Sequence, residues 1–128
     1  VLLAEDNRVN QMVFQRMLAR LGYQVRLANH GAEALSILRD EHVDLVLMDC
    51  QMPELDGYQT TKALRQWGGA YSDLPVIALT ASAMDEDRQA CFASGMNDFL
   101  SKPVIIGDLE ETLSRWRPKR HPGEAAIE

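Results

Sequence analysis

The chain is poor in cysteine, in aromatic residues and in positive charge. Its 128 residues include two cysteines and 6% aromatic residues, and 13 Lys and Arg stand against 19 Asp and Glu, giving a net charge of −6. Such a surface repels phosphate backbones, so no nucleic-acid partner is expected. No stretch approaches the roughly 20 apolar residues that span a bilayer, and the apolar start turns acidic at Glu5, so we expect neither membrane contact by this domain nor a signal peptide.

The cysteines and histidines do not follow the spacing of known metal or disulfide motifs. Cys50 and Cys91 form neither a C-x-x-C pair nor a disulfide framework, which favours reduced thiols and a cytoplasmic location. His30, His42 and His121 lack the spacing of a transition-metal site. The expected histidine positions are therefore surface or partly buried ones.

The 46% of apolar residues fall into short runs typical of buried strands that alternate with helical periodicity. Strands are expected over 1–4, 23–27, 45–48, 75–80 and 98–100, and helices over 8–21, 32–38, 58–67, 85–94 and 108–116. Strands separated by helices pair in parallel through right-handed crossovers. We expect an α/β domain over 1–116 with a doubly wound, five-stranded parallel sheet (order 2-1-3-4-5) and five helices, flavodoxin-like, followed by a flexible tail or linker over 117–128.

Polar residues stand at the carboxyl ends of four of the expected strands. Glu5 and Asp6 follow the first strand, Asp49 the third, Thr80 ends the fourth and Lys102 lies just past the fifth. Sites in open parallel sheets form at this edge, and neighbouring strands lie about 5 Å apart. The sequence therefore predicts that three carboxylates share one small space.

Clustered carboxylates either raise one another's pKa or bind a cation, and an oxygen-only donor set suits Mg²⁺. The expected direct ligands are Asp6, Asp49 and the backbone carbonyl of Gln51, with Glu5 acting through a water; Mn²⁺ is an alternative ion. The competing interpretation is that Glu5 and Asp6 only favour the dipole at the start of the first helix.

Three further residues have a structural and a functional interpretation. Lys102 is either a counter-ion for the acids or a ligand of phosphoryl oxygens. Thr80 is a common strand former that also places a hydroxyl at the edge of the sheet. Phe99, taken alone, is more typical of core than of a switch.

These residues belong to motifs that resemble a known family, the receiver domains of two-component response regulators, and especially the receivers of hybrid sensor histidine kinases. The motifs are VLLAEDN (1–7) followed by Asn10-Gln11, LVLMDCQMPELDG (45–57), IALTA (77–81) and SKP (101–103). They stand in the family's order over residues 1 to about 116, and together they are highly specific.

The resemblance implies a phosphorelay function that depends on Mg²⁺. Asp49 would accept a phosphoryl group from phosphohistidine, Glu5 and Asp6 would hold the metal, Lys102 would contact phosphoryl oxygens, and Thr80 would bond the bound group. Glu5 stands where many relatives carry Asp, a known variation.

The resemblance also implies a switch and a docking surface. Thr80 and the aromatic Phe99 would turn inward together on phosphorylation. Gln51 and Ser82, two residues beyond Asp49 and Thr80, are expected to tune the lifetime of the acyl phosphate.

The partner would be a histidine kinase dimerisation and phosphotransfer domain, or a histidine-containing phosphotransfer protein. The apolar residues Pro103, Val104 and Ile105 are expected to contact it. For Ile105 and Ile106 the alternative is that they anchor the last helix.

Four alternatives compete with a receiver from a hybrid kinase, which would be the cytosolic part of a membrane-anchored protein. A stand-alone response regulator fits the same motifs. A degenerate receiver that only binds partners is opposed by the complete residue set. A phosphoaspartate phosphatase would need an acid where Gln51 stands. Flavin or dinucleotide binding would need a glycine-rich turn in place of residues 5–8. As a receiver, the domain would catalyse its own phosphorylation without being a turnover enzyme.

Overall fold

The fold is a five-stranded parallel sheet with helices on both faces, as the sequence predicts. The structure is a computed structural model that describes residues 1–52, 55–81 and 84–116. The strands are β1 (Leu2–Ala4), β2 (Arg26–Ala28), β3 (Val46–Asp49), β4 (Val76–Thr80) and β5 (Asp98–Ser101). The helices are α1 (Arg8–Arg20), α2 (Gly31–Asp40), α3 (Gly57–Gln66), α4 (Asp85–Ala93) and α5 (Ile106–Trp116), with a short 3₁₀ helix η1 (Gly69–Ser72). The strand order is β2-β1-β3-β4-β5 and all neighbours pair in parallel, which confirms the predicted doubly wound topology.

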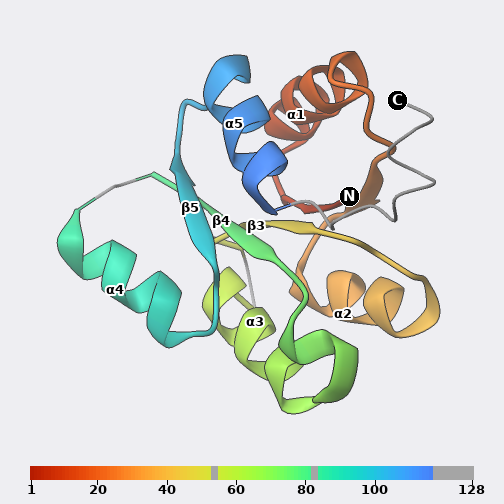
Figure 1. Cartoon of the computed structure of the whole chain (residues 1–128), viewed down its shortest axis with the longest axis vertical. Helices are drawn as coiled ribbons and strands as arrows, with labels where there is room; N and C mark the ends of the chain where they lie inside the picture. The colour runs from red at the N-terminus through yellow and green to blue at the C-terminus, as the bar shows by residue number, and fades with distance from the viewer. Residues whose placement is uncertain (53–54, 82–83, 117–128) are drawn as a thin grey trace.

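Helices α1 and α5 cover one face of the sheet and helices α2, α3 and α4 the other (Figure 1), with an apolar layer on each face. One layer packs side chains of β1, β3 and β4 against Phe14 and Leu18 of α1 and Leu109 and Leu113 of α5. The other packs the opposite face of the same strands against α2, α3 and α4. Burial on both faces explains why β1, β3 and β4 are apolar runs up to the polar residues Asp49 and Thr80 that end β3 and β4.

The edge strand β2 differs from the prediction. The expected strand over 23–27 is observed as Arg26–Ala28, because β2 pairs only with β1, and Leu2 of β1 is in register with Arg26. Before Arg26, the carbonyl of Gln24 accepts from the amino group of Val1 at 3.0 Å. The expected loop over 68–74 contains η1, and the last helix begins at Ile106, two residues earlier than predicted.

The apolar face of α1 is wider than the surface it buries. Phe14 and Leu18 are buried, but Val9, Met12 and Val13 are 67%, 49% and 47% exposed. The periodicity of the sequence does not separate these two groups, since both recur at helical spacing. The exposed group leaves an apolar surface on α1.

The amino end of the sheet is closed by a network around Arg65 of α3. Its guanidinium donates to the backbone carbonyls of Gly95, Tyr71 and Leu74 and to Oδ1 of Asn97, at 2.7 to 2.9 Å. Burial lowers the pKa of Arg65. One side chain thus joins α3, η1, the start of β4 and the loop before β5.

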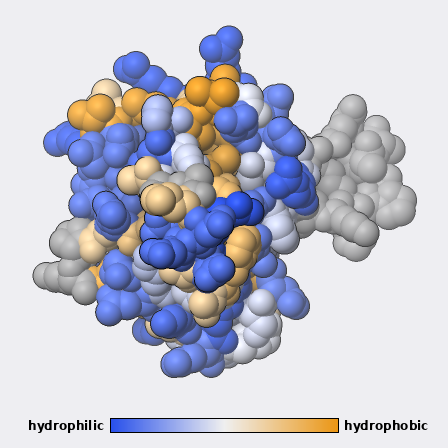
Figure 2. All heavy atoms as spheres, turned by 90° about the vertical axis from the view of Figure 1, so that its left-hand side faces the viewer, coloured by the Kyte–Doolittle hydropathy of each residue, from blue (hydrophilic) through white to orange (hydrophobic). Residues whose placement is uncertain are grey.

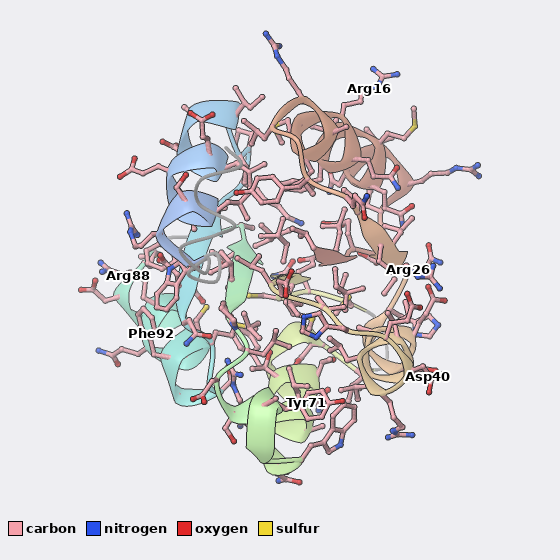
Figure 3. All side chains as sticks on the ribbon, turned by 45° about the vertical axis from the view of Figure 1, so that its right-hand side comes forward. Arg16, Arg26, Asp40, Tyr71, Arg88 and Phe92 are labelled. Carbon is pink, nitrogen blue, oxygen red and sulfur yellow. The ribbon has the colours of Figure 1, made fainter. Side chains whose placement is uncertain are left out.

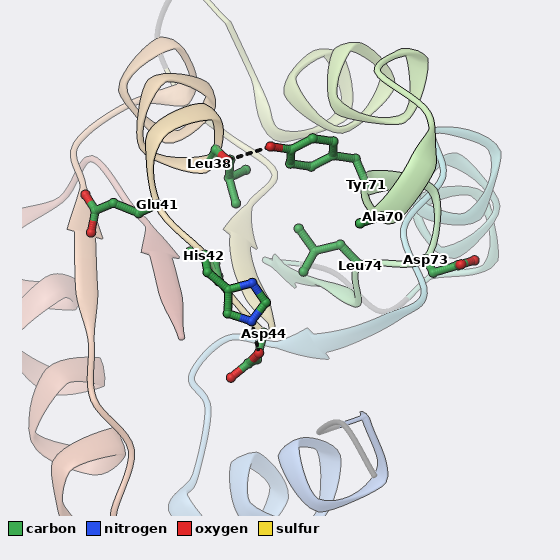
Figure 4. A pocket seen from close by; sticks show the side chains of 9 residues that line it. Leu38, Glu41, His42, Asp44, Ala70, Tyr71, Asp73 and Leu74 are labelled. Atoms are coloured by element: carbon green, nitrogen blue, oxygen red, sulfur yellow. Dashed lines mark hydrogen bonds and ion pairs between the residues drawn. The ribbon is translucent and has the colours of Figure 1, made fainter. Parts of the chain in front are cut away.

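A hollow of about 540 Å³ lies beside this network, between the end of α2 and η1. The hydroxyl of Tyr71 donates to the carbonyl of Leu38 across it at 3.0 Å (Figure 4). His42 and Asp44 lie at its rim, with Nε2 and Oδ1 2.7 Å apart.

Among the described residues, no helix combines the length and the apolar character needed to cross a membrane.

Candidate functional site

The carboxyl ends of β1 and β3 bring three carboxylates together. Ala4 of β1 is in register with Met48 of β3, so the residues that follow them, Glu5 and Asp49, leave adjacent strands at the same edge. One carboxylate oxygen each from Glu5, Asp6 and Asp49 lies within 4.8 Å of the others. Glu5 and Asp49 are buried, at 0% and 3% exposure, and Asp6 is exposed. Of the three acids, Asp6 is therefore the one in contact with solvent.

Lys102 is the cation of this cluster. Its Nζ lies 3.1 Å from Oε2 of Glu5 and 3.2 Å from Oδ2 of Asp49. Burial alone would lower the pKa of Lys102, but the hydrogen bond to Glu5 and the charges of both acids outweigh it, so the pKa is raised. Among the described residues, this one ammonium thus contacts two of the three clustered carboxylates, and the site retains an excess of negative charge.

The surroundings of Asp49 disfavour its ionised form. Burial, and to a smaller extent the negative charge of Glu5, raises the pKa of Asp49 to about 6. The backbone N–H of Gln51 donates to its Oδ1 at 3.0 Å and opposes the rise, as does the charge of Lys102. A carboxylate that is costly to keep ionised gains from any cation or covalent bond that disperses its charge.

Glu5 is held by hydrogen bonds on both of its carboxylate oxygens. It is fully buried, and its Oε1 accepts from the backbone N–H of Asn7 at 3.2 Å and from Nδ2 of Asn10 at 3.4 Å. With Oε2 on Lys102, both oxygens of the carboxylate have partners. Its side chain therefore orients Lys102 as well as adding charge to the cluster.

Gln11 of α1 is a supporting residue to which the sequence analysis gives no role. Its buried Nε2 donates to the backbone carbonyl of Glu5 at 2.7 Å and to Oδ1 of Asn29 at 2.9 Å. Asn29 in turn bonds Glu33 of α2. The signal for it was present in the Asn10-Gln11 pair of the first motif, which places a polar residue on the inner face of an amphipathic helix.

Gly57 lets α3 begin against the end of β3. Its backbone N–H donates to the carbonyl of Cys50 at 3.2 Å. A Cβ at this position would overlap the carbonyl oxygen of Asp49 and lie 3.0 Å from Cα of Cys50. Glycine is therefore required for the close approach that fixes the backbone of the phosphoacceptor candidate.

The donor set fits a small divalent cation. It consists of carboxylate oxygens alone, two of them buried, with an open side at Asp6. Mg²⁺ and Mn²⁺ prefer such oxygens, whereas Zn²⁺ prefers nitrogen and sulfur. The dipole at the start of α1 does not account for the cluster, since Asp49 belongs to another strand and the side chain that caps α1 is Asn7.

The proposed switch residues lie on the two strands beyond β3. Thr80 is 6% exposed, in register with Ser101, and its carbonyl accepts from the backbone N–H of Lys102 at 2.7 Å. Phe99 on β5 is half-buried. Ser82 lies outside the described residues, and Gln51 is exposed beside Asp49.

Phe99 packs against α4. The guanidinium carbon of Arg88 lies 5.1 Å from the centroid of its ring, and Phe92 meets it edge to face at 6.4 Å. Arg88 and Phe92 both project from α4 (Figure 3), and the side of the molecule that α4 covers presents hydrophilic and hydrophobic side chains together (Figure 2).

A groove of about 390 Å³ borders the acidic cluster. It is lined by Asn10, Val13, Phe14, Met17, Ala81, Lys102, Pro103 and Val104. Two of the three residues predicted to contact a partner thus face the groove; the third, Ile105, is 61% exposed. The groove extends from the apolar surface of α1 to Lys102, whose ammonium contacts Glu5 and Asp49.

Comparison with known proteins places these features in one family. The model of the family described as "Response regulator receiver domain" matches residues 1–114. The sensor histidine kinase RcsC of Escherichia coli is 42% identical over 116 residues, which cover 91% of this chain and 12% of that protein. The chain therefore spans about an eighth of the length of this relative.

Solved structures agree. The receiver domain of sensor histidine kinase PA1611 from Pseudomonas aeruginosa, crystallised with magnesium in its active-site cleft, is 44% identical with a TM-score of 0.83, covering 90% of this chain and 93% of that one. A co-crystal structure of the Saccharomyces cerevisiae phosphotransfer protein Ypd1 and the receiver domain of Ssk1 matches at 31% identity, a TM-score of 0.84 and 91% and 86% coverage. On the family model, the sequence identity and the shared fold, this chain belongs to the family of response regulator receiver domains.

Proposed function

We propose that this domain accepts a phosphoryl group from phosphohistidine on Asp49 in a phosphorelay that depends on Mg²⁺. The observation that carries the proposal is the position of Lys102, whose Nζ contacts the carboxylates of Glu5 and Asp49 while Asp6 completes a cluster within a metal's reach. Membership of the receiver family supports it.

The transfer is a displacement at phosphorus. A carboxylate oxygen of Asp49 forms the new O–P bond as the P–N bond of phosphohistidine breaks, and the imidazole keeps the bonding pair and takes up a proton from solvent. Because nucleophile and phosphoryl group are both anionic, catalysis consists of positioning and charge neutralisation. Lys102 lies where it can pass from Asp49 to a phosphoryl oxygen without leaving Glu5.

Asp6 and Asp49, with the backbone carbonyl of Gln51, would hold Mg²⁺ or Mn²⁺. When bound, the ion neutralises phosphoryl oxygens. Asp6 is exposed beside two buried acids, so an incoming phosphoryl group would reach a bound ion from the solvent side.

Phosphorylation would be relayed to the α4–β5 face. In this proposal Thr80 bonds the phosphoryl group and Phe99 leaves its contacts with Arg88 and Phe92. Gln51 is exposed next to Asp49 and would tune hydrolysis by controlling the approach of water. The same role remains proposed for Ser82.

A helical, histidine-bearing partner would dock on the groove beside Lys102. Pro103 and Val104 line this groove together with Val13 of α1, and Ile105 is exposed at its end. The yeast co-crystal structure supports the class of partner, since it pairs a phosphotransfer protein with a receiver domain. A histidine kinase domain of the same helical type is the other candidate.

The likeness to RcsC favours a hybrid sensor histidine kinase as the parent protein, with this domain in the cytoplasm. A stand-alone response regulator is the alternative.

The central experiment is phosphorylation by a small donor. The parent domain, incubated with acetyl phosphate and Mg²⁺, should gain the mass of one phosphoryl group, and Asp49→Asn should gain none. Asp44→Asn is the matched control, because Asp44 is an exposed acid at the opposite end of the sheet. Equal labelling of parent and Asp49→Asn would overturn the assignment, and a lack of labelling in both would favour a domain that only binds partners.

The groove is tested separately. Val104→Ala should slow transfer from a phosphorylated histidine partner about tenfold while leaving labelling by acetyl phosphate unchanged, because only the first reaction needs docking. Unchanged transfer from the histidine partner would remove the groove from the proposal.

A further inference from the structure

Cys50 and Cys91 face each other in the core, although 41 positions separate them in the sequence. Their Sγ atoms lie 4.0 Å apart, both side chains are buried, and both thiols are free. Cys50 follows Asp49 directly, and Cys91 lies on α4. The two sulfurs therefore join the end of the strand that carries the phosphoacceptor candidate to a helix on the face expected to switch.

α4 is weakly anchored. Of its nine residues, all of them described, Cys91 is the one that is fully buried. Arg88 and Phe92, both exposed, contact Phe99 from the surface side. Because few apolar contacts hold it, α4 can open locally at low free-energy cost and admit a small reagent to the thiols.

We propose that Cys50 and Cys91 form a reversible disulfide on reaction with a peroxide, and that this bond fixes α4 to the end of β3. In the first step one thiol attacks hydrogen peroxide, giving a sulfenic acid and water. In the second the other thiol attacks the sulfenic sulfur, giving the S–S bond and a second water. The two sulfurs together lose two electrons and two protons, which a dithiol reductant returns.

The geometry allows the bond with a small displacement. An S–S bond is about 2.0 Å long, so the sulfurs must approach by about half of their present separation. Since α4 has no other fully buried side chain, its movement toward β3 displaces little of the core. Cys50 is held in place at the end of β3, because its backbone N–H donates to the carbonyl of Leu79 at 3.0 Å.

The effect of the bond on signalling rests on the proposed function. If α4 must move when Asp49 is phosphorylated, a covalent tether one residue after Asp49 opposes that movement. Oxidation would then reduce the response of the domain without altering any residue that contacts the phosphoryl group or the metal.

The first test follows the bond itself. The folded domain is treated with hydrogen peroxide, denatured, alkylated with N-ethylmaleimide and weighed as an intact chain. Because the chain holds only these two cysteines, the reduced protein should take two alkyl groups, and the oxidised protein none, with a loss of about 2 Da. Cys91→Ser and Cys50→Ser should each show no such loss. Because peroxide also oxidises exposed methionines such as Met84, oxygen adducts are assigned by peptide mapping. Oxygen adducts on Cys50 or Cys91 in place of the S–S bond, or a dimer on a non-reducing gel, would overturn the proposal.

The second test measures α4 without reference to phosphorylation. Amide hydrogen exchange over residues 85–93 should slow about tenfold in the oxidised parent and recover with dithiothreitol. Exchange over α2 is the internal control and should not change. Unchanged exchange over α4 in a protein that has formed the bond would overturn the tether.

The third test separates the inference from the proposed function. Labelling by acetyl phosphate should slow about fivefold or more in the oxidised parent, and peroxide should leave the labelling of Cys91→Ser unaffected. If neither form of the parent is labelled while the mass and exchange results hold, the proposed function fails and the disulfide stands. Equal labelling rates for the two forms would overturn the regulatory effect.

Discussion

The two ends of the sheet use charge in opposite ways. At the amino end, the guanidinium of Arg65 is matched by four oxygen acceptors that it holds at 2.7 to 2.9 Å. At the carboxyl end, the ammonium of Lys102 contacts the two buried members of a cluster of three carboxylates. In the first arrangement the donors of the guanidinium are matched by acceptors. In the second, negative charge exceeds positive charge, so the cluster can bind a cation and, with it, a phosphoryl group. In this domain stability and reactivity are built at opposite edges.

The largest effect is expected from removing the amino-end network. Arg65→Met should lower the free energy of unfolding by about 3 kcal/mol, because several buried acceptors lose a charged donor. Urea denaturation measures the loss. Arg39→Met is the matched control: Arg39 is exposed and lies over the ring of Trp67, so its loss should cost below about 1 kcal/mol. Mg²⁺ affinity of the folded Arg65→Met protein should match the parent, and a weakened affinity would show that the two ends are coupled.

At the carboxyl end, a substitution is expected to raise the free energy of unfolding. Asp49 has its pKa raised from 3.8 to about 6 in the folded state, so its ionised form opposes folding at neutral pH. Without divalent metal, Asp49→Asn should therefore be more stable than the parent by about 2 to 3 kcal/mol at pH 7.

The pH dependence sharpens this prediction. A raised acid pKa costs nothing when the group is protonated in both states, so the advantage of Asp49→Asn should be full above pH 6 and fade as the pH falls toward 4. Urea midpoints at several pH values measure it. Millimolar Mg²⁺ should narrow or reverse the difference at pH 7, because it binds the folded parent. An advantage that persists at pH 4 would assign the effect to packing instead of charge.

A smaller effect is expected from the residue that supports the acidic loop. Gln11→Leu should weaken Mg²⁺ binding about tenfold, because the amide that fixes the Glu5 carbonyl and Asn29 is lost. Fluorescence or calorimetric titration with Mg²⁺ measures it. Gln15→Leu on the same helix is the control, and equal affinities in the two variants would contradict a positioning role for Gln11.

The smallest effect is expected at the switch face. Arg88→Ala removes the cation from the ring of Phe99 and should cost about 0.5 to 1 kcal/mol of stability. It should also raise the response of α4 to beryllofluoride, since the resting position of Phe99 loses a contact; hydrogen exchange over residues 85–93 reports this. Arg16→Ala on α1 is the control, and identical responses of the two variants would contradict a role for Arg88.

The sequence predicted the parts of the fold that depend on local pattern. The buried strand Val76–Thr80 is apolar up to its last residue, and the helix Gly57–Gln66 follows a helical period, so both were recognisable. The bounds of β2 were wrong because they depend on the register with β1. Similarly, Val9 and Met12 are exposed because no other element packs over that side of α1 in the described structure. The periodicity of the sequence carries no information about which elements pack against a helix.

The candidate site also has features that the sequence could predict and features that it could not. The proximity of Asp6, Asp49 and Glu5 could be predicted, because parallel strands end at one edge and their final residues are visible in the sequence. The full burial of Glu5, its ion pair with Lys102 and the support from Gln11 could not, because they depend on side-chain directions from three separate segments.

By itself, the sequence determined the alternation of strands and helices, the edge at which chemistry collects and the family, since each depends on residue order along the chain. The tertiary structure decided the rest. It brought Cys50 within 4.0 Å of Cys91 and set Arg65 among carbonyls of distant loops. The physical reason is that contacts between segments far apart in the chain are set by how whole layers pack, and no local pattern of residues encodes that distance.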